Sequence, residues 1–493
     1  MSLGHGLLVV KGLDQGAMKF PCGKPKIAAC DAFQALENLR NHMSQPPHEI
    51  NTRAHSEKTP LGRDCIVFIP GMGGSASVDQ TVEGLARRLA AALDKNARDD
   101  TAVFESRVRA LEDLGPFKGE LGSIFRKDER GESAVMDIYK LDYRGALIAP
   151  YENRNLLGKT FLLLQELPGS LLRILKALLT GKSSKTRVEK LQLLYALGIL
   201  CLLVVYVIIL FSALLATIQS LPQVSEYLSG ASQYIKGFPR IAWLTSGWLR
   251  LSQVVVVLGA VLVLFLPPKF NLKEAISKAA VDYLCLIYYL KLGEQRNNIV
   301  GRLEALIDEI SRKSKNELKK GSGKHYERIH LLAYSFGSIV ALDAMFPAER
   351  RPGHPLQAIH TLVTIGCPFD FVRTFWSNYF DRNREYEKNQ PVRWLNVYSP
   401  IDVLASNFRN DSKKDEANIN IRSEQTSTDA DVPVPVNLPF REGLNFSQLS
   451  LSNSLTLIGL RSHSMYWSTG HEAEVNCFGA LVRKLYDGSD VLS

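Results

Sequence analysis

The chain has 493 residues, more than one small domain needs, and its 59 Lys and Arg against 50 Asp and Glu give a net charge of +9. A basic balance suits nucleic acid or an anionic membrane surface. No zinc-finger spacing, RNA-recognition signature or basic helix with interleaved aromatic residues is present, so we expect no nucleic-acid partner and attribute the charge to a membrane. The seven cysteines are scattered, without a C-x-x-C pair, which favours a reducing compartment.

An α/β domain is expected to begin near Asp64. The run C-I-V-F-I-P-G-M-G-G-S predicts a buried strand that ends in a glycine-rich loop. A helix follows, with an apolar stripe at Val82, Leu85, Leu89 and Leu93. Residues 103 to 108 and 135 to 141 are further strand candidates.

The leucine-rich stretch 156 to 179 allows two interpretations. It carries Arg173 and Lys176 on an otherwise apolar helix. One interpretation is a helix that lies in a membrane interface. The other is a core helix that covers the sheet, and the sequence does not decide between them.

Two uncharged runs predict a transmembrane hairpin. Residues 191 to 219 contain no charged residue, and residues 251 to 268 form a second such run that extends back to about 245 if Arg250 is tolerated. Segment 154 to 190 holds eight Lys or Arg and segment 220 to 249 holds two. This asymmetry predicts an integral membrane protein with two spans, whose long segments before and after the hairpin lie in the cytoplasm.

A nucleophilic serine is indicated by R-I-H-L-L-A-Y-S-F-G-S-I-V-A-L-D-A-M, residues 328 to 345. The pattern predicts a strand, a sharp turn at Ser335 and a helix. Such a turn needs small residues two before and two after the serine, here Ala333 and Gly337.

A serine hydroxyl needs a general base, and the base needs an orienting carboxylate. Strands are expected at 359 to 365 and at 392 to 398, and Asp402 follows the second, while Asp370 follows the first and is the alternative acid. For the base we favour His463, in the loop after a last strand expected at 455 to 460, with His471 as the alternative.

Fixed donors must meet the charge that develops on a substrate carbonyl. One is expected from the amide of Phe336, directly after the serine. The other is expected from the amide of Met72 in the loop that also holds Gly71, Gly73 and Gly74.

These motifs together resemble those of α/β-hydrolase lipases and esterases. The resemblance rests on I-P-G-M-G-G, A-Y-S-F-G-S, Asp402 after a later strand, and H-S-M-Y-W near the end, and covers residues 64 to 145 and 300 to 486. It implies a mostly parallel α/β-hydrolase sheet flanked by helices, with Ser335, Asp402 and His463 as the catalytic triad. It implies no metal and no organic cofactor.

The function expected from the resemblance is hydrolysis of a carboxylic ester or thioester, in a lipid or lipid-like substrate, through an acyl-enzyme. The alternatives are a non-catalytic membrane scaffold and an acyltransferase. Neither a substrate nor a protein partner is specified by the sequence. Four segments are expected: an N-terminal extension (1–62), the first part of the hydrolase domain (63–150), a membrane insertion (151–290) and the second part of the domain (291–493).

Overall fold

The computed structural model describes residues 63–72, 80–97, 101–111, 114–129, 131–180, 272–291, 293–321, 324–347, 355–376 and 392–399, most of 194–208, and the short stretches 379–380, 384–386, 402–408, 421–423, 434–439, 463, 465–467 and 477–486. The chain divides into two units, Met1–Thr59 and Pro60–Ser493. Every described residue belongs to the second unit.

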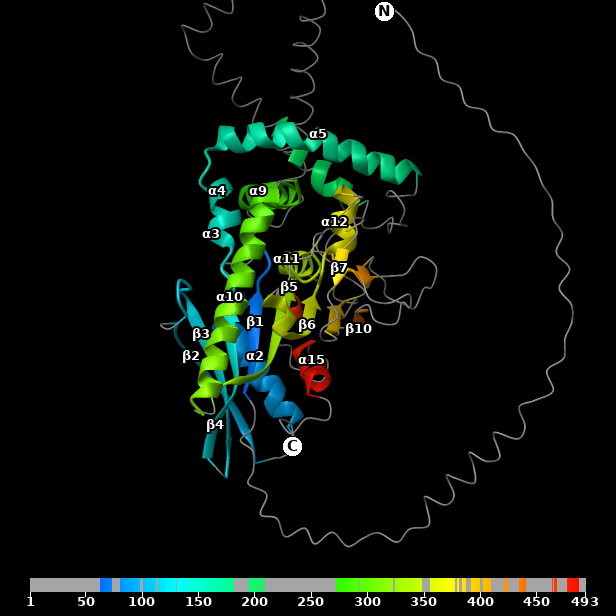
Figure 1. The fold of residues 1–493 in the computed structure, drawn as a ribbon. Helices are drawn as coiled ribbons and strands as arrows, with labels where there is room; N and C mark the ends of the chain where they lie inside the picture. Colours follow the sequence, from blue (N-terminus) through cyan, green and yellow to red (C-terminus); the bar gives the residue numbers. More distant parts are fainter. Residues whose placement is uncertain are drawn as a thin grey trace, which may run out of the picture. The chain divides into compact units, whose positions relative to one another are not determined.

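An eight-stranded, mostly parallel sheet forms the centre of this unit (Figure 1). Its strands lie in the order β10 (Val436–Pro439), β8 (Arg393–Tyr398), β6 (Ile359–Ile365), β5 (Tyr326–Tyr334), β1 (Arg63–Ile69), β4 (Gly131–Lys140), β3 (Glu120–Asp128) and β2 (Val103–Ala110). Only the β4–β3 and β3–β2 pairs in this sheet are antiparallel. Two short strands, β7 (Arg384–Tyr386) and β9 (Ile421–Ser423), pair separately.

Helices cover both faces of the sheet. One face packs on α2 (Val82–Asn96) and α15 (Cys477–Leu485), and the other on α10 (Gly293–Lys319) and α11 (Phe336–Met345). Further helical elements are α3 (Arg144–Leu147), α4 (Ala149–Glu152), α5 (Leu156–Thr180), α9 (Leu272–Lys291), α12 (Phe369–Phe375), and the 3-10 turns at Pro355–Ala358 and Met465–Trp467.

The alternation of β1 explains why it lies at the centre of two cores. Cys65, Val67 and Ile69 join the hydrophobic cluster on the α10 and α11 face, while Ile66 and Phe68 join the cluster on the α2 and α15 face. Successive side chains of a strand point to opposite faces. The segment of β1 from Cys65 to Ile69 is apolar at every position and is therefore buried on both faces, as central parallel strands are.

The expected α/β class and most of the expected elements are confirmed. The helix after the first strand buries the whole apolar stripe that the sequence indicated. The strand expected at 359 to 365 is β6, and the one expected at 392 to 398 is β8. The strand expected at 455 to 460 lies outside the described residues.

The expected membrane hairpin is not supported by the structure. No helix within the described part of the chain is long and apolar enough to cross a bilayer. Of the first apolar run, residues 194 to 208 are in large part described as helical. The rest of that run and the whole second run lie outside the described residues.

Candidate active site

Ser335 occupies a strained turn between β5 and α11. Its backbone has φ 54° and ψ −127°, and it is one of three described non-glycine residues with positive φ. A conformation of this kind costs of order 1–3 kcal/mol and persists only where the surroundings enforce it. The bend ends the strand and begins the helix within one residue, so the side chain stands apart from both.

Small residues on either side allow this turn. A Cβ on Gly337 would lie 2.4 Å from the carbonyl oxygen of Ile69 and 2.6 Å from that of Pro70. Ala333 is fully buried and faces Ile69 in the parallel register of β5 and β1. The start of α11 therefore packs directly on the backbone at the end of β1, as the sequence motif requires.

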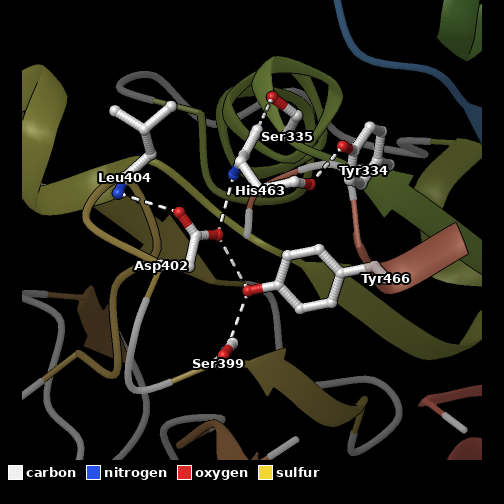
Figure 2. A network of polar contacts seen from close by, with 7 residues as sticks. All are labelled: Tyr334, Ser335, Ser399, Asp402, Leu404, His463 and Tyr466. Atoms are coloured by element: carbon white, nitrogen blue, oxygen red, sulfur yellow. Dashed lines mark hydrogen bonds and ion pairs between the residues drawn. The ribbon is translucent and has the colours of Figure 1, made fainter. Parts of the chain in front are cut away.

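Ser335, His463 and Asp402 form one hydrogen-bonded chain (Figure 2). Ser335 Oγ lies 2.7 Å from His463 Nε2, and His463 Nδ1 lies 2.8 Å from Asp402 Oδ2. The Asp402 side chain is fully shielded from solvent, whereas 12% of the His463 side chain is exposed. A buried carboxylate thus faces one ring nitrogen, and a partly accessible hydroxyl faces the other.

Further donors hold the Asp402 carboxylate in place. Tyr466 donates its hydroxyl to Oδ2 at 2.9 Å, and the amide of Leu404 donates to Oδ1 at 3.0 Å. The Tyr466 hydroxyl also accepts the amide of Ser399 at 2.8 Å. Burial and the nearby Asp402 charge raise the pKa of Tyr466 well above its ordinary value, so the hydroxyl stays protonated and donates.

The imidazole of His463 is fixed by two further contacts. The Tyr334 ring stacks on it with centroids 5.5 Å apart, and the Tyr334 hydroxyl donates to the His463 carbonyl at 2.6 Å (Figure 2). Gly366 lies against the same ring, because a Cβ there would be 3.2 Å from His463 Cε1. Its φ of +56° also favours glycine.

The loop after β1 lies against the serine. A Cβ on Gly71 would be 2.9 Å from Ser335 Cβ, so only glycine fits there without a shift. Tyr143 donates to the carbonyl of Pro70 at 2.6 Å, and the Gly71 amide donates to Gln80 Oε1 at 3.2 Å. These bonds fix the loop from both sides.

The two amides expected to donate hydrogen bonds to the substrate's carbonyl oxygen, those of Phe336 and Met72, both lie in the described part of the chain. Phe336 is the first residue of α11, where a helix leaves its amides without intrahelical partners. Met72 directly follows Gly71 and packs partly buried against the core. Gly73 and Gly74 lie outside the described residues.

The structure tests the alternative acid, Asp370, but not the alternative base, His471. Asp370, in the first turn of α12, accepts a hydrogen bond from the hydroxyl of Ser406, while the carboxylate bonded to His463 is that of Asp402. His471 lies outside the described residues.

Four parts of the site follow strands of the sheet and lie at the carboxyl ends of those strands. Gly71 follows β1, Ser335 follows β5, Gly366 follows β6 and Asp402 follows β8, each at the carboxyl end of its strand. Open parallel sheets bind ligands at the carboxyl ends of their strands. The arrangement can pass a proton from Ser335 Oγ to the imidazole while the carboxylate balances the charge.

Sequence reasoning missed the residues that hold the triad in place. Tyr466 and Gly366 belong to this group, as do Tyr334, Tyr143 and Gln80. One local signal existed, because a glycine that directly follows a buried strand marks a turn with special backbone needs. The tyrosine contacts span up to 129 positions of the chain and left no local signal.

Comparisons with protein-family models, with curated proteins and with solved structures give no match to this chain. Its class therefore rests on its own structure: an α/β protein with a mostly parallel sheet and a hydroxyl, imidazole and carboxylate in hydrogen-bonded sequence. Among the described residues, no group of three or more His, Cys, Asp or Glu side chains is arranged to hold a metal ion.

Proposed function

We propose that the protein is a serine hydrolase of the α/β-hydrolase type that cleaves a carboxylic ester or thioester through an acyl-enzyme. The observation that carries the proposal is the bond of 2.7 Å between Ser335 Oγ and His463 Nε2, continued to Asp402 at 2.8 Å. The strained backbone of Ser335 also supports it, because nucleophile elbows have this geometry.

In the proposed reaction, Ser335 Oγ attacks the acyl carbonyl and its proton passes to His463 Nε2. The amides of Phe336 and Met72 donate to the oxyanion. The imidazolium then gives the proton to the leaving alcohol or thiol, and the acyl group stays on Ser335. Water attacks the acyl-enzyme, again with His463 as base, and releases the acid.

The proposed substrate is a lipid or lipid-like ester, and the protein is proposed to be an integral membrane protein with two spans and a cytoplasmic catalytic domain. Support comes from the uncharged runs 191 to 219 and 251 to 268, which are long enough for the hydrocarbon core. An enzyme anchored in a bilayer meets lipid at high local concentration.

Turnover of two ester classes tests this function. The full chain in detergent or vesicles is given long-chain phospholipid or acylglycerol esters and, separately, short water-soluble esters, with Ser335→Ala as the matched control. We expect faster turnover of the long-chain esters, release of free acid, and loss of both activities in the variant.

Each other outcome has a defined meaning. Transfer of the acyl group to an added alcohol without free acid would identify an acyltransferase. Equal turnover of short esters would remove the lipid preference. Activity that persists in Ser335→Ala, or no acyl transfer to any acceptor, would contradict the proposed mechanism.

A further inference from the structure

The outward face of α5 is largely apolar, although it does not pack on the described part of the protein. The exposed positions of the helix recur at spacings of three and four, which places them on one side. We call this side the α5 outer face; its exposed residues are Phe161, Leu164, Gln165, Pro168, Gly169, Leu172, Leu175, Lys176 and Leu179. Surface helices of soluble proteins show the opposite pattern, with polar residues outside.

The inner side of α5 attaches the helix firmly to the domain. Leu163, Leu167 and Ile174 are buried in the main hydrophobic cluster. Glu166 on this side pairs with Lys291 at the end of α9. Arg173 stacks over the Trp376 ring at 4.7 Å, just after α12. The helix therefore presents its outer face in a fixed orientation.

Large apolar side chains on the α5 outer face are highly exposed, and their contact with water is unfavourable. Phe161 and Leu172 are each 68% exposed, and Leu179 is 87% exposed. The exposed residues include no carboxylate and a single cation, Lys176. From position 161 to 179 the face is about 27 Å long at 1.5 Å per residue. A continuous apolar strip of this size marks an interaction surface.

We propose that the α5 outer face lies in the interfacial layer of a lipid bilayer, with the helix parallel to the membrane plane. Lipid fits better than a protein partner because cations follow the strip directly: Lys176 lies on it, and Lys182, Lys185, Arg187 and Lys190 come next along the chain. Apolar helices with flanking Lys and Arg bind anionic bilayers in this way. An uncharged run begins at residue 191, directly after these cations.

This placement orients the candidate active site. α5 contacts α9 and α12, and α12 begins just beyond the carboxyl end of β6, the sheet edge that holds Ser335 (Figure 1). In α9, the Tyr289 ring lies 5.0 Å from that of Phe336, the residue after the serine. α5 contacts α9, and α9 contacts the residue after Ser335, so the helix proposed to lie on the bilayer is close to the candidate active site. The inference goes beyond the proposed hydrolysis, since it rests on the surface of α5 and on the cations that follow it, and on no step of catalysis.

Photolabelling from the lipid side tests the proposal. The full chain is reconstituted in phosphatidylcholine and phosphatidylserine vesicles that contain a phosphatidylcholine with a diazirine on its acyl chain. After illumination, adducts are located by peptide mass spectrometry. We expect adducts on Phe161, Leu164, Leu172, Leu175 and Leu179, and none on Leu318, an exposed leucine of α10.

A double variant gives the second measurement. Leu172→Asp with Leu179→Asp should reduce the α5 adducts at least about tenfold, because charged side chains are expelled from the acyl region. The matched control Leu318→Asp, at a leucine that is 57% exposed, should leave them unchanged.

An unlabelled α5 in the wild-type protein overturns the proposal. That result is expected if residues 209 to 271 of this chain or another protein cover the outer face. Equal labelling of α5 in the double variant also overturns it. Neither readout involves catalysis, so a chain without esterase activity still gives a clear answer.

Discussion

At the scale of single residues, the two competing carboxylates predict opposite results for their amide variants. Asp402→Asn removes the charge that faces His463 Nδ1 at 2.8 Å, so we expect kcat to fall about 10³- to 10⁴-fold. Asp370→Asn retains an acceptor for Ser406 and should leave kcat within about threefold. Steady-state kinetics on one ester decide the matter, and a larger loss in Asp370→Asn would reverse the assignment of the acid.

Gly366 gives a second residue-scale prediction. In Gly366→Ala the new methyl group would lie 2.9 Å from Tyr466 Cε2 and 3.2 Å from His463 Cε1. The imidazole must shift, so kcat should fall tenfold or more, roughly what small misplacements of reacting groups cost. The stability loss from the positive φ is about 1 kcal/mol.

Gly321→Ala is the control for Gly366→Ala. Gly321 has a φ of +63°, and a Cβ at this position would have no atom within 4 Å, so it shares the backbone cost without the contact. We expect a similar loss of thermal stability and unchanged kcat. Full activity in Gly366→Ala would show that the ring of His463 is not held by this contact.

The sequence predicted the three residues of the hydrogen-bonded chain but not the residues that hold them in place. Ser335, Asp402 and His463 follow one another in a recognisable order, and each falls near the end of an expected strand. The contact of Tyr466 with Asp402 joins residues that are 64 positions apart in the chain. A long-range contact of this kind is invisible to local pattern reading.

At the scale of elements, α11 packs closely on β1 at Gly337. We therefore expect Gly337→Ala to lower the free energy of unfolding and Gly301→Ala, in α10, to raise it. Gly337→Ala would place a Cβ 2.4 Å from the Ile69 carbonyl, so the helix must move from the strand. We expect a loss of about 1–3 kcal/mol in the free energy of unfolding, together with lost activity. Urea denaturation followed by fluorescence measures it.

Gly301→Ala, in the interior of α10, should change stability in the opposite direction. Nothing lies within 4 Å of a Cβ at this position, and alanine has the higher helix propensity by about 1 kcal/mol. Equal effects of the two substitutions would contradict the tight packing of α11 on β1.

Elements were predictable where burial alone set their pattern. β6 and β8 were predicted from I-H-T-L-V-T-I and V-R-W-L-N-V-Y, short runs rich in β-branched and aromatic residues, and most of their side chains are buried. β3 (Glu120–Asp128) was missed, because Gly122 and the flanking charges give a weak strand pattern. Its glycine has a tertiary cause, since a Cβ there would meet Val82 of α2 at 2.8 Å.

Of the two interpretations of the stretch 156 to 179, the helix that covers the core is confirmed for one side of α5, and the membrane-interface helix stays a prediction. Its inner side is buried in the core, as a covering helix requires, and its outer face is exposed and apolar. Composition could not separate the two sides, since the large leucine content is shared between them. Only the direction in which each side chain points distinguishes them.

At the scale of the whole molecule, Asp64 joins segments from opposite ends of the chain. Its carboxylate accepts two hydrogen bonds from Arg328, at 3.0 and 2.9 Å, and one from Tyr486 at 2.9 Å. Because Asp64 is buried, Asp64→Asn leaves the charge of Arg328 without its partner. We expect a loss of about 3 kcal/mol in the free energy of unfolding near neutral pH.

The same contacts predict how this stabilisation depends on pH. Burial alone would raise the pKa of Asp64, but the hydrogen bonds and charges of His330 and Arg328 outweigh it and lower the pKa below its ordinary value of 3.8. A lowered folded-state pKa contributes stability above the unfolded value, and this stability is lost as pH falls through the folded value. The difference between wild type and Asp64→Asn should therefore shrink below pH 3.8.

Glu317→Gln is the control for Asp64→Asn. Glu317 pairs with the 68% exposed Lys320 at 3.1 Å, and a pair on the surface contributes less than about 0.5 kcal/mol. Urea denaturation of both variants at two pH values separates the cases. If the stability difference between wild type and Asp64→Asn grew as the pH fell, the lowered pKa of Asp64 would be contradicted.

Covalent labelling of Ser335 tests the central claim most directly. A fluorophosphonate loses fluoride when an activated serine oxygen attacks phosphorus, and peptide mass spectrometry locates the adduct. We predict one adduct on Ser335 in the wild-type protein, none in Ser335→Ala, and much slower formation in His463→Ala. An adduct at another residue, or equal labelling of all three proteins, would contradict a serine activated by His463.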